Sequence, residues 1–265
     1  MAVSQQVKTI TQMLDEAPDV DVRETWQALW DILSEIKDRI VAEFEVIRHP
    51  SSVAYDYYQA GDFEGSLNTY SGPQLEWFVH SWLGNRTASL LDMNLNVWLG
   101  PHIDAPHLCI VFGTVPHLFH YSDLIARRDI GVDADYVRRY YEPENDDYLA
   151  FRGDPRFTWS VSHGAYMRAI ISPVAHSYTA ERTLDNVEVL RGHVMKRFER
   201  WLDQVRTAPP VREQDRAALQ ERDHRLREQV YSLDPMNALA ERFMGVETAQ
   251  KMVKLRYGAD QLAGR

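Results

Sequence analysis

A chain of 265 residues, of which 45% are hydrophobic, can form one large domain or two small ones. Its single cysteine, Cys109, excludes an internal disulfide and a cysteine-based zinc site. The net charge of −10 argues against a nucleic-acid partner, because phosphates attract a positively charged surface. No apolar run reaches the roughly 18 residues of a membrane span, and residues 1–15 contain no signal-peptide core. We therefore expect a cytoplasmic protein with no membrane partner.

The first two thirds of the chain begin with a helical pattern and continue with strand patterns. Apolar residues recur at helical spacing across residues 20–48, which predicts one long amphipathic helix. Across residues 91–99, apolar residues alternate with others, and this period of two predicts a strand with one polar face. That polar face would carry Asp92, Asn94, Asn96 and Trp98. Residues 127–141 show helical spacing, and three further runs predict strands, namely 108–115, 118–125 and 157–172.

The last third of the chain is predicted to be helical. Residues 183–206 form an amphipathic helix, and residues 212–231 form a solvated helix with a narrow apolar seam. A last helix begins at Asp234-Pro235 and continues through Met244 and Met252. Helices, then strands, then helices predict an α/β fold of the α+β type, in which an antiparallel β-sheet is sandwiched between α-helices. We assign residues 1–208 to this domain. Residues 209–265 form an extra C-terminal helical hairpin that packs on the domain or on a second subunit, as in a homodimer.

Candidate acid and base residues come from the histidines, of which seven of ten lie between His80 and His176. Histidine is the side chain best matched to proton transfer near neutral pH. The run His102-x-Asp104-x-x-His107 contains metal-binding residue types, but its prolines make it a loop with no defined ligand geometry, and we predict no metal. We expect catalysis to involve His107, His120, His163 and Asp104.

Candidate substrate-binding residues are polar and aromatic side chains on the predicted strands. On the strand predicted for residues 157–172, Tyr166 and Arg168 share one face, and Arg168 could hold a carboxylate or phenolate through two hydrogen bonds. The chain also contains 13 tyrosines and 7 tryptophans, which suit a pocket for a flat conjugated ligand. The predicted substrate-binding set is Asn94, Asn96, Trp98, Tyr121, Tyr166 and Arg168.

The sequence lacks the common cofactor motifs. It has no glycine-rich dinucleotide loop, no phosphate loop, no His-Glu-x-x-His and no Gly-x-Ser-x-Gly elbow. No motif therefore indicates NAD, FAD, ATP or a zinc protease, and we predict an enzyme with no bound cofactor.

An ordered series of segments resembles the red chlorophyll catabolite reductase family. The series spans roughly residues 70–205 and consists of 77–83 (WFVHSWL), 93–97 (MNLNV), 104–108 (DAPHL), 123–129 (DLIARRD), 136–142, Ser172-Pro173 and 201–204 (WLDQ). The resemblance implies the fold shared with ferredoxin-dependent bilin reductases, with the ligand between the sheet and the C-terminal helices. It also implies that the substrate takes electrons directly from ferredoxin while side chains supply protons.

The sequence departs from the family pattern at the expected acids. Family reductases carry an acidic residue seven positions past the Asp of the Asp-x-Pro turn, and here that position is Val111. For a second acid, near the start of the long C-terminal helix, the nearest candidate is Asp185, while the local match reads Gly192-His193. Neither valine nor glycine can donate a proton. The acidic net charge also disfavours docking of acidic ferredoxin.

Three functions follow from these observations. The lost acid and the histidine cluster favour a lyase that acts without a cofactor on an aromatic or phenolic molecule, such as a lignin-derived dimer. A histidine base would start the reaction, and a small fragment such as formaldehyde or CO2 would leave. The first alternative is ferredoxin-dependent reduction of a linear tetrapyrrole, with Asp104 or His107 as the replacement proton donor. The second alternative is a non-catalytic binder of a conjugated ligand.

Overall fold

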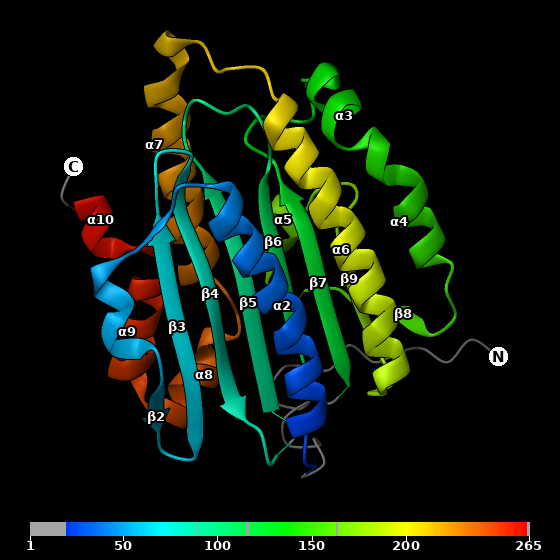
Figure 1. The fold of residues 1–265 in the computed structure, drawn as a ribbon, viewed down its shortest axis with the longest axis vertical. Coiled ribbons are helices and arrows are strands. Elements are labelled where there is room, and N and C mark those ends of the chain that lie inside the picture. Colours follow the sequence, from blue (N-terminus) through cyan, green and yellow to red (C-terminus); the bar gives the residue numbers. More distant parts are fainter. Residues whose placement is uncertain (1–19, 89, 115–116, 163, 264–265) are drawn as a thin grey trace.

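The computed structural model describes residues 20–88, 90–114, 117–162 and 164–263. Its centre is an antiparallel sheet with the strand order β1-β3-β4-β5-β6-β7-β9-β8, and β2 pairs with β3 (Figure 1). The strands are β1 (Ile47–Arg48), β2 (Tyr58–Ala60), β3 (Phe63–Ser71), β4 (Leu75–Asn85), β5 (Leu90–Leu99), β6 (His107–Gly113), β7 (Leu118–Ile125), β8 (Phe157–Trp159) and β9 (His176–Ala180).

Helices cover both faces of this sheet. Figure 1 shows α2 (Arg23–Glu43) and α6 (Leu184–Thr207) crossing the near face, with α3 (Ala134–Tyr140) and α4 (Asn145–Arg152) beside α6. The far face is covered by α5 (Ala165–Ile170), α7 (Glu213–Ser232), α8 (Asn237–Met244) and α9 (Val246–Tyr257), and α10 (Ala259–Ala263) follows. The predicted helix–sheet–helix sandwich of the α+β type is therefore confirmed. The division at residue 208 stays a prediction.

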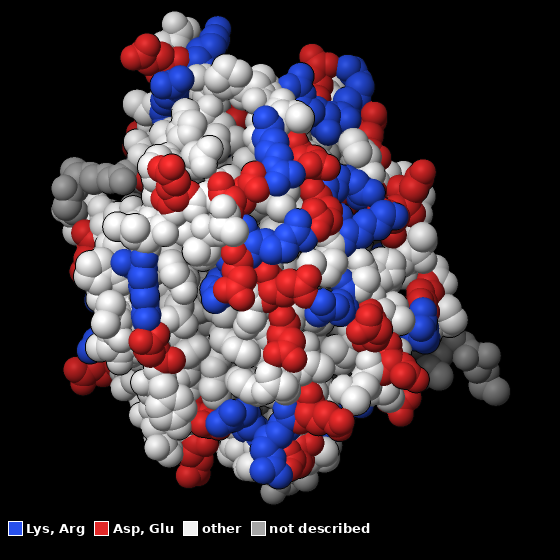
Figure 2. Space-filling model, viewed as in Figure 1, with Lys and Arg blue, Asp and Glu red and all other residues white. Residues whose placement is uncertain are grey.

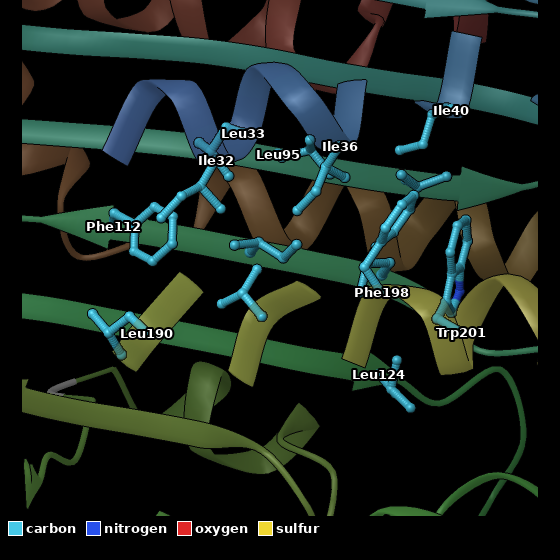
Figure 3. Close-up of a cluster of buried hydrophobic side chains, with 14 of the residues drawn as sticks. Ile32, Leu33, Ile36, Ile40, Leu95, Phe112, Leu124, Leu190, Phe198 and Trp201 are labelled. Carbon is cyan, nitrogen blue, oxygen red and sulfur yellow. The ribbon is translucent and has the colours of Figure 1, made fainter. Parts of the chain in front are cut away.

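The near-face core forms because the strands and helices present matching apolar faces. Leu95, Phe112 and Leu124 point from three neighbouring strands toward α2 and α6 (Figure 3). They pack against apolar side chains of both helices. From α2 these are Ile32, Leu33, Ile36 and Ile40, at helical spacing, and from α6 they are Leu190, Phe198 and Trp201. The predicted helices 20–48 and 183–206 are confirmed by these elements, within a few residues at each end.

The outer surface of α2 and α6 mixes positive and negative charges. Arg39 pairs with Glu199, and Arg206 pairs with Glu43, so each pair links the two helices. Figure 2 shows blue and red side chains interspersed over this face. The net negative charge is therefore not gathered into a single acidic patch on this side. No helix in the described ranges has the length and apolar character needed to cross a membrane.

Three secondary-structure predictions need correction. Of the strand predicted for residues 157–172, only Phe157–Trp159 form a strand, β8, and Ala165–Ile170 form the helix α5. Alanine and methionine in that segment favour a helix, and β8 is the edge strand of the sheet that the described residues form. The helix predicted for residues 127–141 is shorter, because Asp133 caps α3 by accepting a hydrogen bond from the amide of Tyr136.

The single last helix is in fact two. α8 ends and α9 begins at Gly245, which has a φ of +80°. This left-handed region suits glycine and breaks the helix. The alternation pattern also gave no prediction for β4, because β4 is buried on both faces and its sequence does not alternate.

Burial of histidine in the near-face core has a consequence for stability. His80 of β4 stacks on Trp30, with 4.0 Å between ring centroids, and it is 3% exposed. Burial, with a smaller effect of Lys37, lowers the pKa of His80 to about 3. Since the unfolded state then binds the extra proton between about pH 6.5 and pH 3, this histidine costs stability as the pH falls through that range.

We expect the difference in unfolding free energy between the wild type and His80→Gln to shift by about 2 kcal/mol between pH 7.5 and pH 5. The wild type loses stability relative to the variant, because glutamine does not titrate. Urea unfolding of both proteins at the two pH values measures this shift. An equal difference at both pH values would contradict it.

Candidate functional site

A set of polar side chains lies on the face of the sheet beneath α7, α8 and α9. In the strand register, Asn94 of β5 lies opposite Val111 of β6, and Val111 lies opposite Tyr121 of β7. Residues two positions apart on a strand share a face. Asp92, two residues before Asn94, therefore lies on the same face. Asn96, Cys109 and Asp123 lie opposite one another on that face, two residues along each strand in the other direction. The predicted polar face of β5 is confirmed, and it faces the C-terminal helices.

Asp92 and Asn94 form the centre of this face together with an arginine from α9. The amide of Asn94 donates a hydrogen bond of 2.5 Å to Asp92 Oδ2, and Arg256 donates one of 2.7 Å to Asn94 Oδ1. The Arg256 guanidinium lies 4.9 Å from the ring centroid of Tyr231. Asp92, Asn94 and Arg256 line a cavity of about 50 Å³, whose other walls include Tyr58 and residues of α8 and α9.

The two carboxyl groups near this cavity have raised pKa values. Burial, together with nearby Asp234, raises the pKa of Asp92 to about 6, whereas Arg256 and Asn94 act in the opposite direction. Burial also raises the pKa of Asp234, against the effect of Arg256. A carboxyl group with a pKa of about 6 is protonated in a useful fraction of molecules near neutral pH. Asp92 can therefore act as a proton donor.

A second acid, Asp123, lies two strands away on the same face. Its carboxylate accepts hydrogen bonds from the hydroxyl groups of Tyr121 (2.8 Å) and Ser172 (2.5 Å) and from the amide of Ser172 (3.1 Å). Burial nevertheless raises the pKa of Asp123. Asp123 is fully buried, and its carboxylate is satisfied by these hydrogen bonds. Its main role is therefore to connect β7 to the turn before β9.

His107 also lies on this face, and its surroundings keep it neutral. Its Nδ1 accepts a hydrogen bond from the amide of Leu99, and its Nε2 lies 3.4 Å from Asp223 of α7. Burial lowers the pKa of His107 to about 4, although Asp223 opposes this effect. A neutral histidine whose proton points at Asp223 is a poor proton donor to a ligand. Among the described residues, no three His, Cys, Asp or Glu side chains come together to hold a metal ion.

The structure separates the other predicted catalytic residues from this face. His120 points to the opposite face of the sheet, where its ring lies 5.3 Å from that of Phe112. Asp104 lies in the loop after β5 and pairs with Arg128 at 2.8 Å. His163 lies outside the described residues.

The predicted binding residues Tyr166 and Arg168 lie on α5 and not on a strand. Arg168 donates a hydrogen bond of 2.7 Å to the carbonyl of Ser162. Tyr166 lines an open groove of about 570 Å³ along α7, together with Arg222 and Arg225. Of the predicted binding set, Asn94, Asn96, Trp98 and Tyr121 share the sheet face described above.

Sequence reasoning missed Asp92, Asp234 and Arg256 as site residues. Asp92 had a signal, because it lies on the predicted polar face with Asn94. Asp234 and Arg256 are more than 140 residues away from it along the chain, so only the packing of the C-terminal helices on the sheet brings them near.

Comparison with known proteins decides the family. A model of the family described as red chlorophyll catabolite reductase (RCC reductase) matches residues 25–256. The chain belongs to the red chlorophyll catabolite reductase family. The predicted resemblance is confirmed, and it extends beyond residues 70–205 into the C-terminal helices.

Plant reductases are among the relatives of this family member. The chain is 23% identical to the chloroplastic red chlorophyll catabolite reductase of Arabidopsis thaliana over 86% of its own length and 77% of that protein. It is 24% identical to the red chlorophyll catabolite reductase of Hordeum vulgare over 68% of its length and 92% of that protein. Among solved structures, phytochromobilin synthase from tomato in complex with biliverdin matches with a TM-score of 0.76 and 16% identity, over 86% of this chain and 82% of that one.

These findings correct the predicted reaction. A lyase that acts without a cofactor and expels a small fragment was the leading expectation, and it is wrong, because the matching family and its relatives are reductases. The error came from treating Val111 as the loss of the acid function. Val111 lies opposite Asn94 of the neighbouring strand, and Asp92 is two residues before Asn94 on the same face. An acid is therefore still present on this face.

Segments that carry the family resemblance contact one another in the fold. The indole of Trp201 donates a hydrogen bond of 3.0 Å to the carbonyl of Pro106. The turn at Ser172-Pro173 is bound by Asp123, which belongs to another of these segments. The shared motifs are therefore positions at which helix α6 and the turn before β9 are joined to the sheet.

Proposed function

We propose that this protein reduces a linear tetrapyrrole with electrons from ferredoxin. Membership of the red chlorophyll catabolite reductase family supports the reaction class. The observation that carries the proposal is Asp92, a carboxyl group with a pKa of about 6, beside the position where family members have their acid. In this reaction the conjugated substrate takes up electrons one at a time, and the protein supplies protons and excludes water.

The proposed reaction adds two electrons and two protons across one double bond of the substrate. Each electron comes from one reduced ferredoxin, which is oxidised in turn. Asp92 gives its proton to the substrate as the negative charge develops, and its carboxylate is then protonated again from solvent. Asp234, whose pKa is also raised, can supply the second proton from the same cluster.

The polar groups of the face favour catalysis over simple ligand binding. A non-catalytic binder of a conjugated molecule needs an apolar aromatic pocket, whereas here Asp92, Asn94 and Arg256 converge on one cavity. Trp98 and Tyr231 add aromatic surface beside them. The cytoplasmic location and the homodimer stay predictions from the sequence.

We expect biliverdin, used as a probe, to bind the purified protein and to change its absorption spectrum. Turnover should require reduced ferredoxin, because the proposed reaction takes both of its electrons from ferredoxin. The measurement is an anaerobic spectroscopic titration, followed by addition of ferredoxin with a reducing system. Absence of any spectral change, or loss of the bilin spectrum without an electron donor, would argue against the proposed reaction.

A further inference from the structure

The site beneath the C-terminal helices is too small for a tetrapyrrole as it stands. Its cavity measures about 50 Å³, whereas pockets for small organic ligands usually measure about 300–1,000 Å³. The cavity lies between Asp92 and Asn94 on the sheet and residues of α8 and α9. Entry of a substrate therefore requires that a side chain from these helices leave the space.

Arg256 is the charged side chain that α9 extends into this space. It makes one hydrogen bond to Asn94 and lies over the ring of Tyr231. Its Nε is buried and has no acceptor among the described residues. A buried donor without a partner is unfavourable, so part of the guanidinium gains nothing from staying in this position.

The backbone of Arg256 is anchored, so its side chain is the part that can leave. The indole of Trp77 donates a hydrogen bond of 2.8 Å to the carbonyl of Arg256. Gly258, with a φ of +70°, lies two residues further on, and a Cβ there would meet the Trp77 ring at 2.9 Å. This close contact holds the end of α9 against β4. The long arginine side chain can still rotate, and the flexible Met244 and Met252 beside the cavity can repack.

Removal of the guanidinium changes the charge around Asp92. The groups that act on Asp92 are Arg256 from α9, Asp234 from the segment after α7, and Asn94 from its own strand. Tyr58 of β2 lines the same cavity, and Cys109 of β6 lies further along the same sheet face, opposite Asn96. Both are neutral because burial raises their pKa values. Arg256 is thus the cation that favours the Asp92 carboxylate. When the uncharged conjugated rings of a ligand replace it, Asp234 remains and favours the protonated acid.

We propose that Arg256 is a positioning residue that fills the empty site and is displaced by substrate, so that Asp92 takes up a proton from solvent when substrate binds. This inference rests on the proposed function and deepens it. It makes the proton donor available in the substrate complex, where the proton is needed, and it keeps Asp92 largely ionised in the free protein. The proton moves from solvent to the Asp92 carboxylate, and then to the substrate as an electron arrives.

The first test needs no ligand. Asp92 is titrated by carbon-13 NMR in the wild type, in Arg256→Gln and in Lys254→Gln, with Asp92→Asn used for assignment. Lys254 is exposed on the same helix and provides the matched control. We expect Arg256→Gln to raise the pKa of Asp92 by at least about one unit and Lys254→Gln to leave it unchanged. Equal pKa values in all three proteins would overturn the inference.

The second test measures proton uptake when biliverdin binds at pH 7, by calorimetry in two buffers of different ionisation enthalpy. The wild type and Lys254→Gln should take up about one proton. Arg256→Gln should take up no more than about half a proton, because at least about half of its Asp92 is already protonated at this pH. Binding with equal uptake in the wild type and Arg256→Gln would overturn the inference and leave the proposed function intact. Failure of biliverdin to bind any of the proteins would remove both the proposed function and the displacement step.

Discussion

Replacement of Asp92 by asparagine should lower the rate of bilin reduction by a factor of about 10²–10⁴, which is the usual contribution of a general acid. Asparagine keeps the shape of the side chain and can still accept the hydrogen bond from Asn94. It cannot donate an acidic proton. Binding of biliverdin should therefore be retained while its reduction is lost. The measurement is a single-turnover absorbance experiment with reduced ferredoxin, together with a binding titration.

The control for this experiment is Asp104→Asn. Asp104 is also an aspartate near the strands, but it lies in the loop before β6, where it pairs with the partly exposed Arg128. We expect this variant to reduce the substrate at the wild-type rate. If Asp92→Asn kept full activity while Asp104→Asn lost it, the acid would lie in the loop, and the proposed role of the β5 face would have to be abandoned.

The alternation of β5 already contained most of the information about the polar face. Asp92, Asn94, Asn96 and Trp98 occupy every second position, so a strand must place them on one side. The same rule shows why His120 and Tyr121 could not both line one site, since adjacent residues on a strand point to opposite faces. Strand parity alone therefore excludes a site that uses both His120 and Tyr121.

The remaining parts of the site depend on long-range packing. The position of Asp92 relative to Val111 depends on the register between β5 and β6. The hydrophobic pattern of the sequence does not specify this register. The identity of the helices over the polar face depends on how α7 and α9 return to the sheet, and Arg256 enters the site only through that return. Local spacing also could not separate α5 from a strand, because Tyr166 and Arg168 fit both patterns in a short segment.

Removal of the Asp223 carboxylate should strongly destabilise the fold. Asp223 of α7 accepts a hydrogen bond from Arg127 Nε (2.8 Å), and Arg127 Nη2 lies 2.7 Å from the same carboxylate as an ion pair. Asp223 also lies beside His107. Burial alone would raise the pKa of Asp223, but His107 and Arg127 lower it to about 2, so it is ionised at neutral pH. Arg127 and Asp223 are almost fully buried. We expect Asp223→Ala to lower the free energy of unfolding by about 3–5 kcal/mol, because it leaves a buried cation unpaired.

Urea unfolding at pH 7.5 measures this loss, and Asp215→Ala provides the matched control on the same helix. Asp215 pairs with Arg212 at the exposed start of α7, and such surface pairs contribute about 0–1 kcal/mol. The double variant Arg127→Met with Asp223→Leu should recover part of the stability, since it removes both charges and keeps apolar volume. A loss below about 1 kcal/mol in Asp223→Ala would mean that solvent reaches Arg127 easily. In that case the ion pair would not be what holds α7 over the polar face, and the cover of the site would depend on apolar contacts of Leu226 and Tyr231 with Trp98 instead.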